Sequence, residues 1–271
     1  MKFSHPCIAI FSMCALTAYA GPIVDLGTAA PFAVLAGTMV TNTDPTTING
    51  SVGVSAGSAI TGFPPGIITG GTTHAGDAVA AQAQLDLTTA YNAAAGAACG
   101  TILTGQDLGG LVLTPGVYCF ATSAQLTGVL TLNGLGDPLS QFIFQIGTAL
   151  TTASASSVLF ENGAEGSGLF WQVGSSATLG TTTSFEGNIL ADASITLDTG
   201  ATIGCGRALA RSGAVTLDAN VVSIDPGVCS TAAGGVIPEP GSATLLGSGL
   251  LIGIIAVWAR RALPLRRQQR L

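Results

Sequence analysis

Two aspartates occupy matching places in the chain, and their spacing is the first arrangement that could do chemistry. Asp198 and Asp218 each directly follow a Thr-Leu pair. If the two segments stack, the carboxylates become neighbours, and paired carboxylates can hydrolyse a glycosidic bond. An aspartate directly after a strand more commonly accepts hydrogen bonds from the turn backbone. We expect this turn role, so no catalytic residue is predicted and the protein is not expected to be an enzyme.

Other residue types that support catalysis or cofactor binding are sparse. Arg207 and Arg211 could hold a sugar acid, but we expect them to pair with nearby acids such as Asp192. The chain has no Gly-x-Ser-x-Gly, no His-Glu cluster and no Walker loop. It also has no Cys-x-x-Cys, and His74 is the only histidine in residues 21–235. We therefore expect neither a metal site nor a cofactor.

Threonine and serine pairs are the more informative chemical signal. A threonine presents a hydroxyl and a methyl together, and a rigid lattice of such groups can order water around the methyls while the hydroxyls anchor it. The alternative is that these residues only solvate a β surface, which threonine favours in any case. The candidate positions for a water-ordering surface are Thr181, Thr183, Thr199, Thr202, Thr151, Ser154, Ser55, Ser58, Thr38 and Thr41.

A short repeat must position these residues. Residues 171–179, 189–197 and 209–217 are similar, and their Thr-Leu pairs at 178/179, 196/197 and 216/217 lie 18 and then 20 residues apart. A period near 20 with short β-prone runs predicts the stacked coils of a β-solenoid, with equivalent residues roughly 4.8 Å apart. We expect the column of Thr178, Thr196 and Thr216 to point in a different direction from the column of Thr181 and Thr199.

One helix is expected to interrupt the coils, at about residues 75–98. This stretch lacks proline and is rich in residues that favour helix. Asp77 lies near its start, where the helix dipole favours an acid, and Gly100 is a plausible stop. Its apolar face has 3 and 4 residue spacing and consists of Ala80, Ala83, Leu87, Ala90, Tyr91, Ala94 and Ala98. The fold class is therefore mainly β, a solenoid with one long flanking helix.

Both ends of the chain have the character of processing signals. Residues 1–20 match a secretory signal peptide with cleavage after Ala20. Residues 230–237 read as a linker, and residues 243–259 form an uncharged apolar run followed by five arginines, which predicts a membrane-spanning helix with a cytoplasmic end. The folded domain is expected at 21–229.

Charge and cysteines limit the partners of this domain. Residues 21–235 hold thirteen acids and two arginines, which gives a net charge near −11. A nucleic-acid partner is disfavoured because nothing could neutralise phosphates. Cys99, Cys119, Cys205 and Cys229 remain after signal-peptide removal, and an even number suits an exported chain. Three pairings are possible, of which we favour Cys99–Cys119 and Cys205–Cys229 because they are nearest in sequence; we expect a monomer.

Several separated motifs between Val24 and Ile224 resemble the microbial ice-binding proteins. They are residues 51–66 (Ser-Val-Gly-Val-Ser-Ala-Gly-Ser-Ala-Ile-Thr-Gly-Phe-Pro-Pro-Gly), 74–82, 113–118, 142–146 and 171–180. The resemblance implies an irregular right-handed β-solenoid of triangular section beside one long helix. It also implies adsorption to ice through one flat face, with thermal hysteresis and inhibition of recrystallisation.

Some members of that family carry Thr-Ala/Gly-x-Thr/Asn on the flat face. Here Thr199-Gly-Ala-Thr202 fits this pattern fully, whereas Thr181 to Ser184 and Ser55 to Ser58 are degenerate forms. An alternative function is a surface adhesin or biofilm-matrix protein that binds polysaccharide on the same face. A glycan-cleaving β-helix that uses Asp198 and Asp218 is the third possibility.

The C-terminal region resembles a PEP-CTERM sorting tag. Its sorting motif, Pro238, Glu239 and Pro240, precedes the apolar run and the arginine cluster. The resemblance implies processing by an exosortase in a Gram-negative bacterium, after export across the inner membrane. The mature protein would then be secreted or held at the cell surface, with a transient anchor through residues 243–259. The alternative is a simple membrane anchor.

Overall fold

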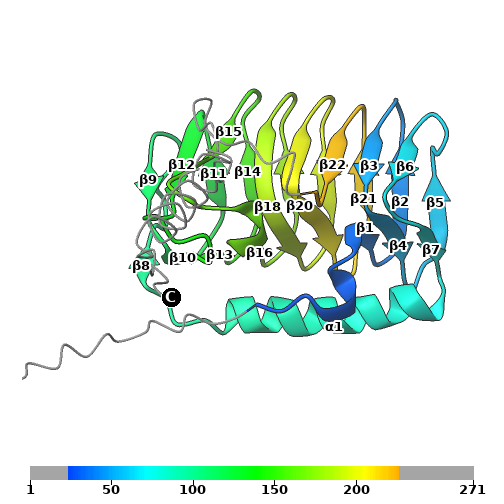
Figure 1. The fold of residues 1–271 in the computed structure, drawn as a ribbon, viewed down its shortest axis with the longest axis horizontal. Helices are drawn as coiled ribbons and strands as arrows, with labels where there is room; N and C mark the ends of the chain where they lie inside the picture. The colour runs from blue at the N-terminus through cyan, green and yellow to red at the C-terminus, as the bar shows by residue number, and fades with distance from the viewer. Residues whose placement is uncertain (1–23, 226–271) are drawn as a thin grey trace, which may run out of the picture. The chain divides into compact units, whose positions relative to one another are not determined.

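The computed structural model of the chain describes residues 24–225, and these form a stack of β coils beside one helix (Figure 1). All strand pairs are parallel and belong to two sheets, which we call sheet A and sheet B. No helix between residues 24 and 225 is long and apolar enough to cross a membrane.

The predicted processing signals lie outside the described residues. These are the signal peptide 1–20, the linker 230–237, the sorting motif of Pro238, Glu239 and Pro240, and the apolar run 243–259. The predicted cleavage, sorting and membrane-spanning roles of these segments therefore stay predictions.

The strands form three rows, and each row is one face of the stack. Sheet B is a single row, in the spatial order β11 (Ala124–Leu126), β14 (Leu150–Thr152), β17 (Ala177–Leu179), β19 (Ile195–Leu197), β21 (Val215–Leu217), β2 (Met39–Asn42) and β5 (Ala59–Thr61). Sheet A contributes the other two rows, because the long strands β18 (Ser184–Ala191) and β20 (Thr202–Ala210) bend and belong to both. The bend coincides with a shift of register between Glu186 and Asn188.

The first row of sheet A packs against the helix, and we call it the covered face. Its spatial order is β8 (Thr101–Ile102), β10 (Gly116–Phe120), β13 (Phe142–Ile146), β16 (Leu169–Val173), β18, β20, β1 (Phe32–Ala36), β4 (Ser51–Val54) and β7 (Thr73–Ala75).

The second row of sheet A is the third face of the stack. Its order is β9 (Val112–Leu113), β12 (Val129–Asn133), β15 (Ser157–Glu161), β18, β20, β22 (Val221–Ser223), β3 (Thr47–Asn49) and β6 (Ile67–Thr69). Two short 3-10 turns, η1 (Gly27–Ala29) and η2 (Gly166–Gly168), complete the described elements.

The helix separates coils that precede it in the chain from coils that follow it, as predicted, and the spatial order of the coils differs from their chain order. The N-terminal coils form one end of the stack, and the last coil docks on the first through β20–β1, β21–β2 and β22–β3. In Figure 1 the orange β22 therefore lies beside the blue β3. The helix α1 (Ala78–Ala95) runs along the stack and returns the chain toward the far end, where β8 begins. Its 18 residues span about 27 Å at 1.5 Å per residue.

The helix boundaries are narrower than the predicted 75–98. Asp77 is the N-cap, and its carboxylate accepts a hydrogen bond of 2.8 Å from the Ala80 N–H. The helix ends at Ala95 with Gly96 as its C-cap, so the stop predicted at Gly100 is wrong and Ala98 is exposed beyond the helix. The other small residues of the predicted face are buried as expected: Ala80, Ala83, Leu87, Ala90 and Ala94.

Aromatic rings fill the centre of the coils. Tyr118, Phe144 and Trp171 stack with ring centroids 5.3 and 4.1 Å apart, and Phe185 follows at 4.9 Å. Offset stacking of this kind adds roughly 0.5–1.5 kcal/mol per pair to simple burial. The Trp171 indole N–H donates to the Glu186 carbonyl at 3.0 Å, so its one polar atom is satisfied.

The repeat predicted from residues 171–217 is present, with one correction to its register. Trp171 pairs with Ile189, as the sequence alignment requires, but Ile189 pairs with Ala208 rather than Leu209. The Thr-Leu pairs are nevertheless in register, since Thr196 pairs with Thr216. One extra residue in the corner before β21 accounts for the difference, because the chain needs four residues there and three in the preceding coil.

The disulfide Cys99–Cys119 confirms one predicted pairing. It ties the chain that leaves α1 to β10, one coil into the stack. Cys205 is also disulfide-bonded, and Cys229, the partner predicted for it, lies outside the described residues.

Candidate functional site

Sheet B presents an in-register column of threonines on its outer surface. Alternate residues of a strand point to opposite faces, and in β11, β14, β17, β19 and β21 both residues that flank the central one are buried. Direct register partners then place one residue of every coil in a single outward line. This threonine column consists of Gln125, Thr151, Thr178, Thr196, Thr216, Thr41 and Thr61.

A second outward column lies two residues earlier in each coil. The ladder hydrogen bonds continue through these positions, for example from the Ala177 N–H to the Ser194 carbonyl at 3.0 Å and from Ile195 to Ala214 at 2.9 Å. All its members are at least partly exposed. This small-residue column consists of Ser123, Ala149, Ser176, Ser194, Ala214, Met39 and Ala59.

The two columns form a flat grid with spacings fixed by the backbone. Neighbouring strands are roughly 4.8 Å apart, and residues two apart on one strand are separated by about 6.6 Å. Across the junction of the two chain segments, the Thr41 and Thr216 hydroxyl oxygens lie 3.5 Å apart. Neither column contains an acid, a base or an aromatic ring. The grid is held rigidly because the residues between and beside the columns, such as Leu179, Ile195 and Leu217, are completely buried.

The predicted candidates are divided among several parts of this surface. Thr151 and Thr41 belong to the threonine column. Thr38 and Ser58 are exposed directly before β2 and β5, whereas Ser55 lies earlier in its coil and is half-buried. These positions border the grid on the side of the covered face.

The column of Thr181 and Thr199 lies on the opposite border, at the corner between sheet B and the third face. Ser154, Thr181 and Thr199 stack there, with the Ala155 N–H donating to the Thr181 carbonyl at 2.9 Å and the Thr182 N–H to the Thr199 carbonyl at 3.1 Å. This confirms that the two threonine columns face different directions.

The Thr199-Gly-Ala-Thr202 motif does not form one flat surface. Thr199 is exposed at the corner, and Thr202 begins β20 on the third face. The Thr199 hydroxyl donates to the Asp218 carboxylate, which fixes the side chain within the turn. The Asp218 carboxylate therefore accepts from a side chain of the neighbouring coil, not from the turn backbone as the sequence predicted.

Thr183 cannot contact an outside surface, so its inclusion among the candidates is wrong. It is fully buried, and its hydroxyl lies 2.9 Å from the Thr152 hydroxyl and donates to the Ala153 carbonyl at 3.1 Å. The corner turns inward at this residue, so its hydroxyl ties one coil to the next.

The candidate list missed most of the threonine column. Thr178, Thr196, Thr216 and Thr61 were not among the predicted site residues, although the first three defined the repeat. The signal was available: in a Thr-Leu pair with a buried leucine, the threonine must face outward. The predicted candidates followed the Thr-x-x-Thr spacing instead, which selects Thr181 and Thr199 at the corner.

The two arginines of the described chain lie away from the grid, whereas Asp198 and Asp218 directly follow β19 and β21 at its corner. Arg207 pairs with no acid between residues 24 and 225, contrary to the prediction; its Nε and Nη2 donate to the Ala30 carbonyl at 2.8 and 2.7 Å, and Nη1 donates to Asn188 Oδ1 at 2.7 Å. Burial lowers the pKa of Arg207 to about 10, which still leaves it protonated at neutral pH. Arg211 makes the predicted ion pair with Asp192 at 2.6 Å and lies over the Tyr91 ring at 4.5 Å.

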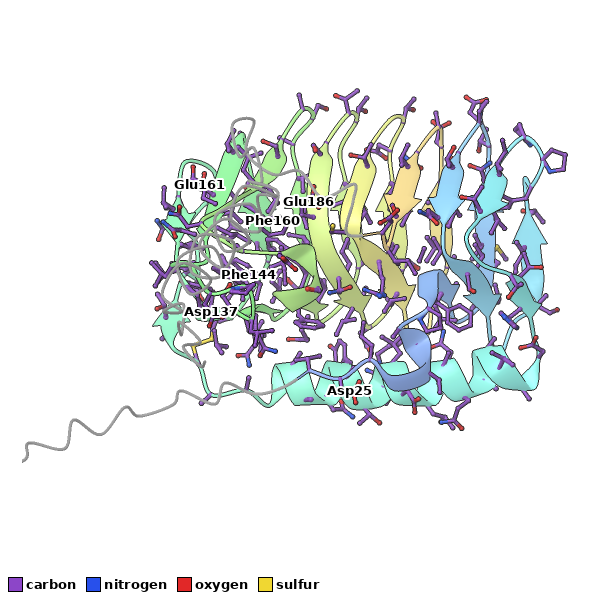
Figure 2. All side chains as sticks on the ribbon, viewed as in Figure 1. Asp25, Asp137, Phe144, Phe160, Glu161 and Glu186 are labelled. Carbon is purple, nitrogen blue, oxygen red and sulfur yellow. A yellow bond between two sulfur atoms is a disulfide. The ribbon has the colours of Figure 1, made fainter. Side chains whose placement is uncertain are left out.

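Three of the labelled acids are easily placed in the side-chain view: Asp25 lies beside α1, and Asp137 and Glu161 lie toward the end of the stack that carries β8, β9 and β10 (Figure 2). The described chain contains no group of three or more histidine, cysteine or acidic side chains placed to hold a metal ion.

Comparison with known proteins gives one consistent family. Residues 34–223 match the family model described as ice-binding-like. An ice-binding protein of Nostoc sp. (strain HG1) is 56% identical over 247 residues, which is 90% of each chain. An ice-binding protein of Colwellia sp. is 36% identical over 219 residues, 75% of this chain and 85% of that protein.

Solved structures of the same kind share the fold. The ice-binding protein from an Antarctic biological consortium has a TM-score of 0.71 at 50% identity, over 74% of this chain and 90% of that one. The ice-binding protein of the ascomycete Antarctomyces psychrotrophicus has a TM-score of 0.72 at 45% identity, over 74% and 98%. With a family model that spans most of the solenoid and relatives of this identity, the chain belongs to the ice-binding-like family.

Proposed function

We propose that this protein adsorbs to ice through the grid formed by the two outward columns of sheet B. The family and its relatives named as ice-binding proteins support the activity. The observation that carries the choice of face is the threonine column, in which six of seven coils place a threonine at the same outward position.

The mechanism follows from the two groups that each threonine presents. Water next to the methyls cannot hydrogen-bond to them and becomes ordered, while the hydroxyls donate to and accept from the same layer. Because the grid is rigid and uncharged, ordering this layer requires no rearrangement of the protein and no removal of a charge from water. Protein molecules fixed on an ice surface force the crystal to grow with a curved front between them, and growth stops.

The other two faces are less suited to this contact. The covered face is occupied by α1, which buries Leu35, Leu190 and Leu209. The third face also has an in-register column, but it includes the large aliphatic side chains of Ile67, Val129 and Val221, with exposed fractions of 59%, 43% and 45%. These side chains break the regular array of small groups that a crystalline water layer requires.

The polysaccharide-binding alternative has little support from the grid. Neither column offers an aromatic ring on which a sugar could stack, and neither has a charged group that could hold a sugar acid. Asp198 and Asp218 do neighbour each other at the corner, but Asp218 is hydrogen-bonded to Thr199. We therefore retain ice as the ligand.

Three tyrosine substitutions test the choice of face. Thr178→Tyr places a bulky side chain in the middle of the threonine column and should remove more than half of the thermal hysteresis. Thr199→Tyr alters the corner, and Thr131→Tyr alters the outer surface of β12 on the third face; both should retain activity. Melting curves must show that all three variants fold. If Thr199→Tyr loses activity while Thr178→Tyr keeps it, the corner column is the ice-binding surface instead.

We also propose that the protein is exported and that an exosortase processes its C-terminal tag. The signal-like residues 1–20 and the motif of Pro238, Glu239 and Pro240 support this, as does the Cys99–Cys119 disulfide, since disulfides persist in oxidising compartments. Cell fractionation with mass spectrometry of the mature ends is the test. A mature protein that begins at Met1 and retains residues 243–259 would contradict it.

A further inference from the structure

Two long side chains interrupt the grid on sheet B. Gln125 replaces the threonine in one end strand, β11, and Met39 stands in the small-residue column on β2. Met39 is 42% exposed. Between these two residues lie four consecutive strands, β14, β17, β19 and β21, in which every outward position is Ala, Ser or Thr.

We infer that ice contacts only these four coils, and that Met39 and Gln125 are the residues that limit the contact. This inference rests on the proposed ice-binding role of sheet B. The contact patch then consists of Ala149, Thr151, Ser176, Thr178, Ser194, Thr196, Ala214 and Thr216.

Met39 limits the patch because of its size and its flexibility. Its neighbours in the column are Ala214 and Ala59, which extend only a methyl group from the backbone. A methionine side chain has three rotatable bonds and stands well above such neighbours. To let a flat crystal reach Thr61 in the next coil, the side chain would have to lie flat and lose its rotamer freedom, which opposes binding.

Gln125 limits the patch at the other end for a different reason. Its amide extends beyond the level of a threonine and donates through two hydrogens as well as accepting. Gln125 forms a parallel β-bridge with Asp107 of the coil beyond it. The Asp107 carboxylate accepts hydrogen bonds from the Gly109 and Thr127 N–H groups at 2.7 and 2.9 Å. The coil beyond Gln125 therefore brings a charge to the border, and ordered water at a carboxylate is oriented by that charge.

The first experiment tests whether the Met39 side chain prevents ice that is bound to the patch from also contacting Thr61. We expect Met39→Ser to raise thermal hysteresis at equal protein concentration, and Met39→Ala to do the same. Thr61→Tyr should leave the activity of the wild type nearly unchanged but reduce the gain in the Met39→Ser background. This coupling is the specific signature, because two independent positions would add instead.

A matched control shows whether a gain in hysteresis depends on the position of the side chain on sheet B or on the loss of any large exposed side chain. Ile67→Ser removes a large exposed side chain from the third face and should leave hysteresis unchanged. Gln125→Thr completes the threonine column and should give a smaller gain than Met39→Ser, because it adds one coil rather than two. Circular dichroism melts should show that each variant remains folded; Met39 and Gln125 are exposed enough that no internal cavity forms.

The outcomes distinguish this inference from the proposed function. If Thr178→Tyr abolishes activity while both Met39 variants leave it unchanged or lower it, ice binding on sheet B stands and the four-coil limit is overturned. A loss in Thr61→Tyr as large as that in Thr178→Tyr also overturns the limit. If Thr178→Tyr is fully active, the proposed face itself is wrong.

Discussion

The covered face of sheet A and the grid of sheet B are built on the same coils but interact with different partners. Both rows point alternate residues into the shared core. They differ in the residues that point outward: Leu35, Leu190 and Leu209 on the covered face, and Ser, Ala and Thr on sheet B. The apolar row recruits a helix of the same chain. The small polar row remains free to contact water.

Side-chain hydrogen bonds and a cation–π contact also stabilise the packing on the covered face. Both arginines of the described region act there: Arg207 holds the Ala30 carbonyl before β1, and Arg211 lies against Tyr91 of α1. The Gln145 side chain donates to carbonyls at the end of α1, including those of Ala94 and Ala97 at 2.9 and 2.6 Å. On sheet B the hydrogen bonds are almost all within the backbone ladder. One side of the stack thus holds the helix and stabilises the fold, and the other keeps its outward side chains available for the ice contact proposed above.

The largest expected effect comes from weakening the covered face. Leu87 of α1 is fully buried, and Leu87→Ala should destabilise the protein by about 2–5 kcal/mol because it removes packed methyl groups and leaves a cavity. Each kcal/mol lowers Tm by roughly 2–4 °C in a chain of this size. Thermal unfolding followed by circular dichroism measures the shift.

Leu85→Ala is the matched control, because Leu85 lies on the same helix with an exposed fraction of 64%. It should change Tm little. Near 0 °C both variants should still shape ice if they are folded, since neither touches sheet B. Equal losses of Tm in the two variants would mean that the covered face does not hold the helix as described.

The sequence predicted the covered face better than the grid. Ala80, Ala83, Leu87 and Ala94 recur at helical spacing, and burial of an apolar stripe is a strong signal. The Cys99–Cys119 pairing and the Arg211–Asp192 ion pair were also predicted correctly, because each joins residues that a short stretch or a neighbouring coil brings together.

The grid was harder to predict because its register depends on contacts distant in the sequence. Thr41 joins Thr216 only when the last coil docks on the first, and no local pattern shows that docking. Corner lengths also differ from coil to coil, so a Thr-x-x-Thr spacing does not reveal which residues turn inward. Thr183 occupies the position of Ala201 in the neighbouring coil, and both are fully buried, whereas Ser184 is the register partner of Thr202. The contact of Arg207 was predicted wrongly for a similar reason. Ala30 lies far from Arg207 in the sequence, so no local pattern shows that the Ala30 carbonyl accepts hydrogen bonds from the guanidinium.

A change of pH should have the smallest effect on activity. It should alter the stability of the helix side but not the ice contact of sheet B. On the helix side, hydrogen bonds from the Thr28 hydroxyl and N–H lower the pKa of Asp86, and the Ala80 N–H and His74 lower that of Asp77. Because these folded-state pKa values lie below the ordinary value of 3.8, both groups stabilise the fold above that pH. The stabilisation is lost as the pH falls through the lowered values.

Sheet B has no ionisable side chain in either column, so its contact with ice should not titrate. We therefore expect thermal hysteresis to stay constant from about pH 5 to about pH 9, whereas Tm falls in more acidic solution, where Asp77 and Asp86 become protonated. Asp86→Asn should weaken the acid dependence of Tm and leave the hysteresis profile flat. A hysteresis change between those two pH values in fully folded protein would show that a titrating group takes part in the ice contact.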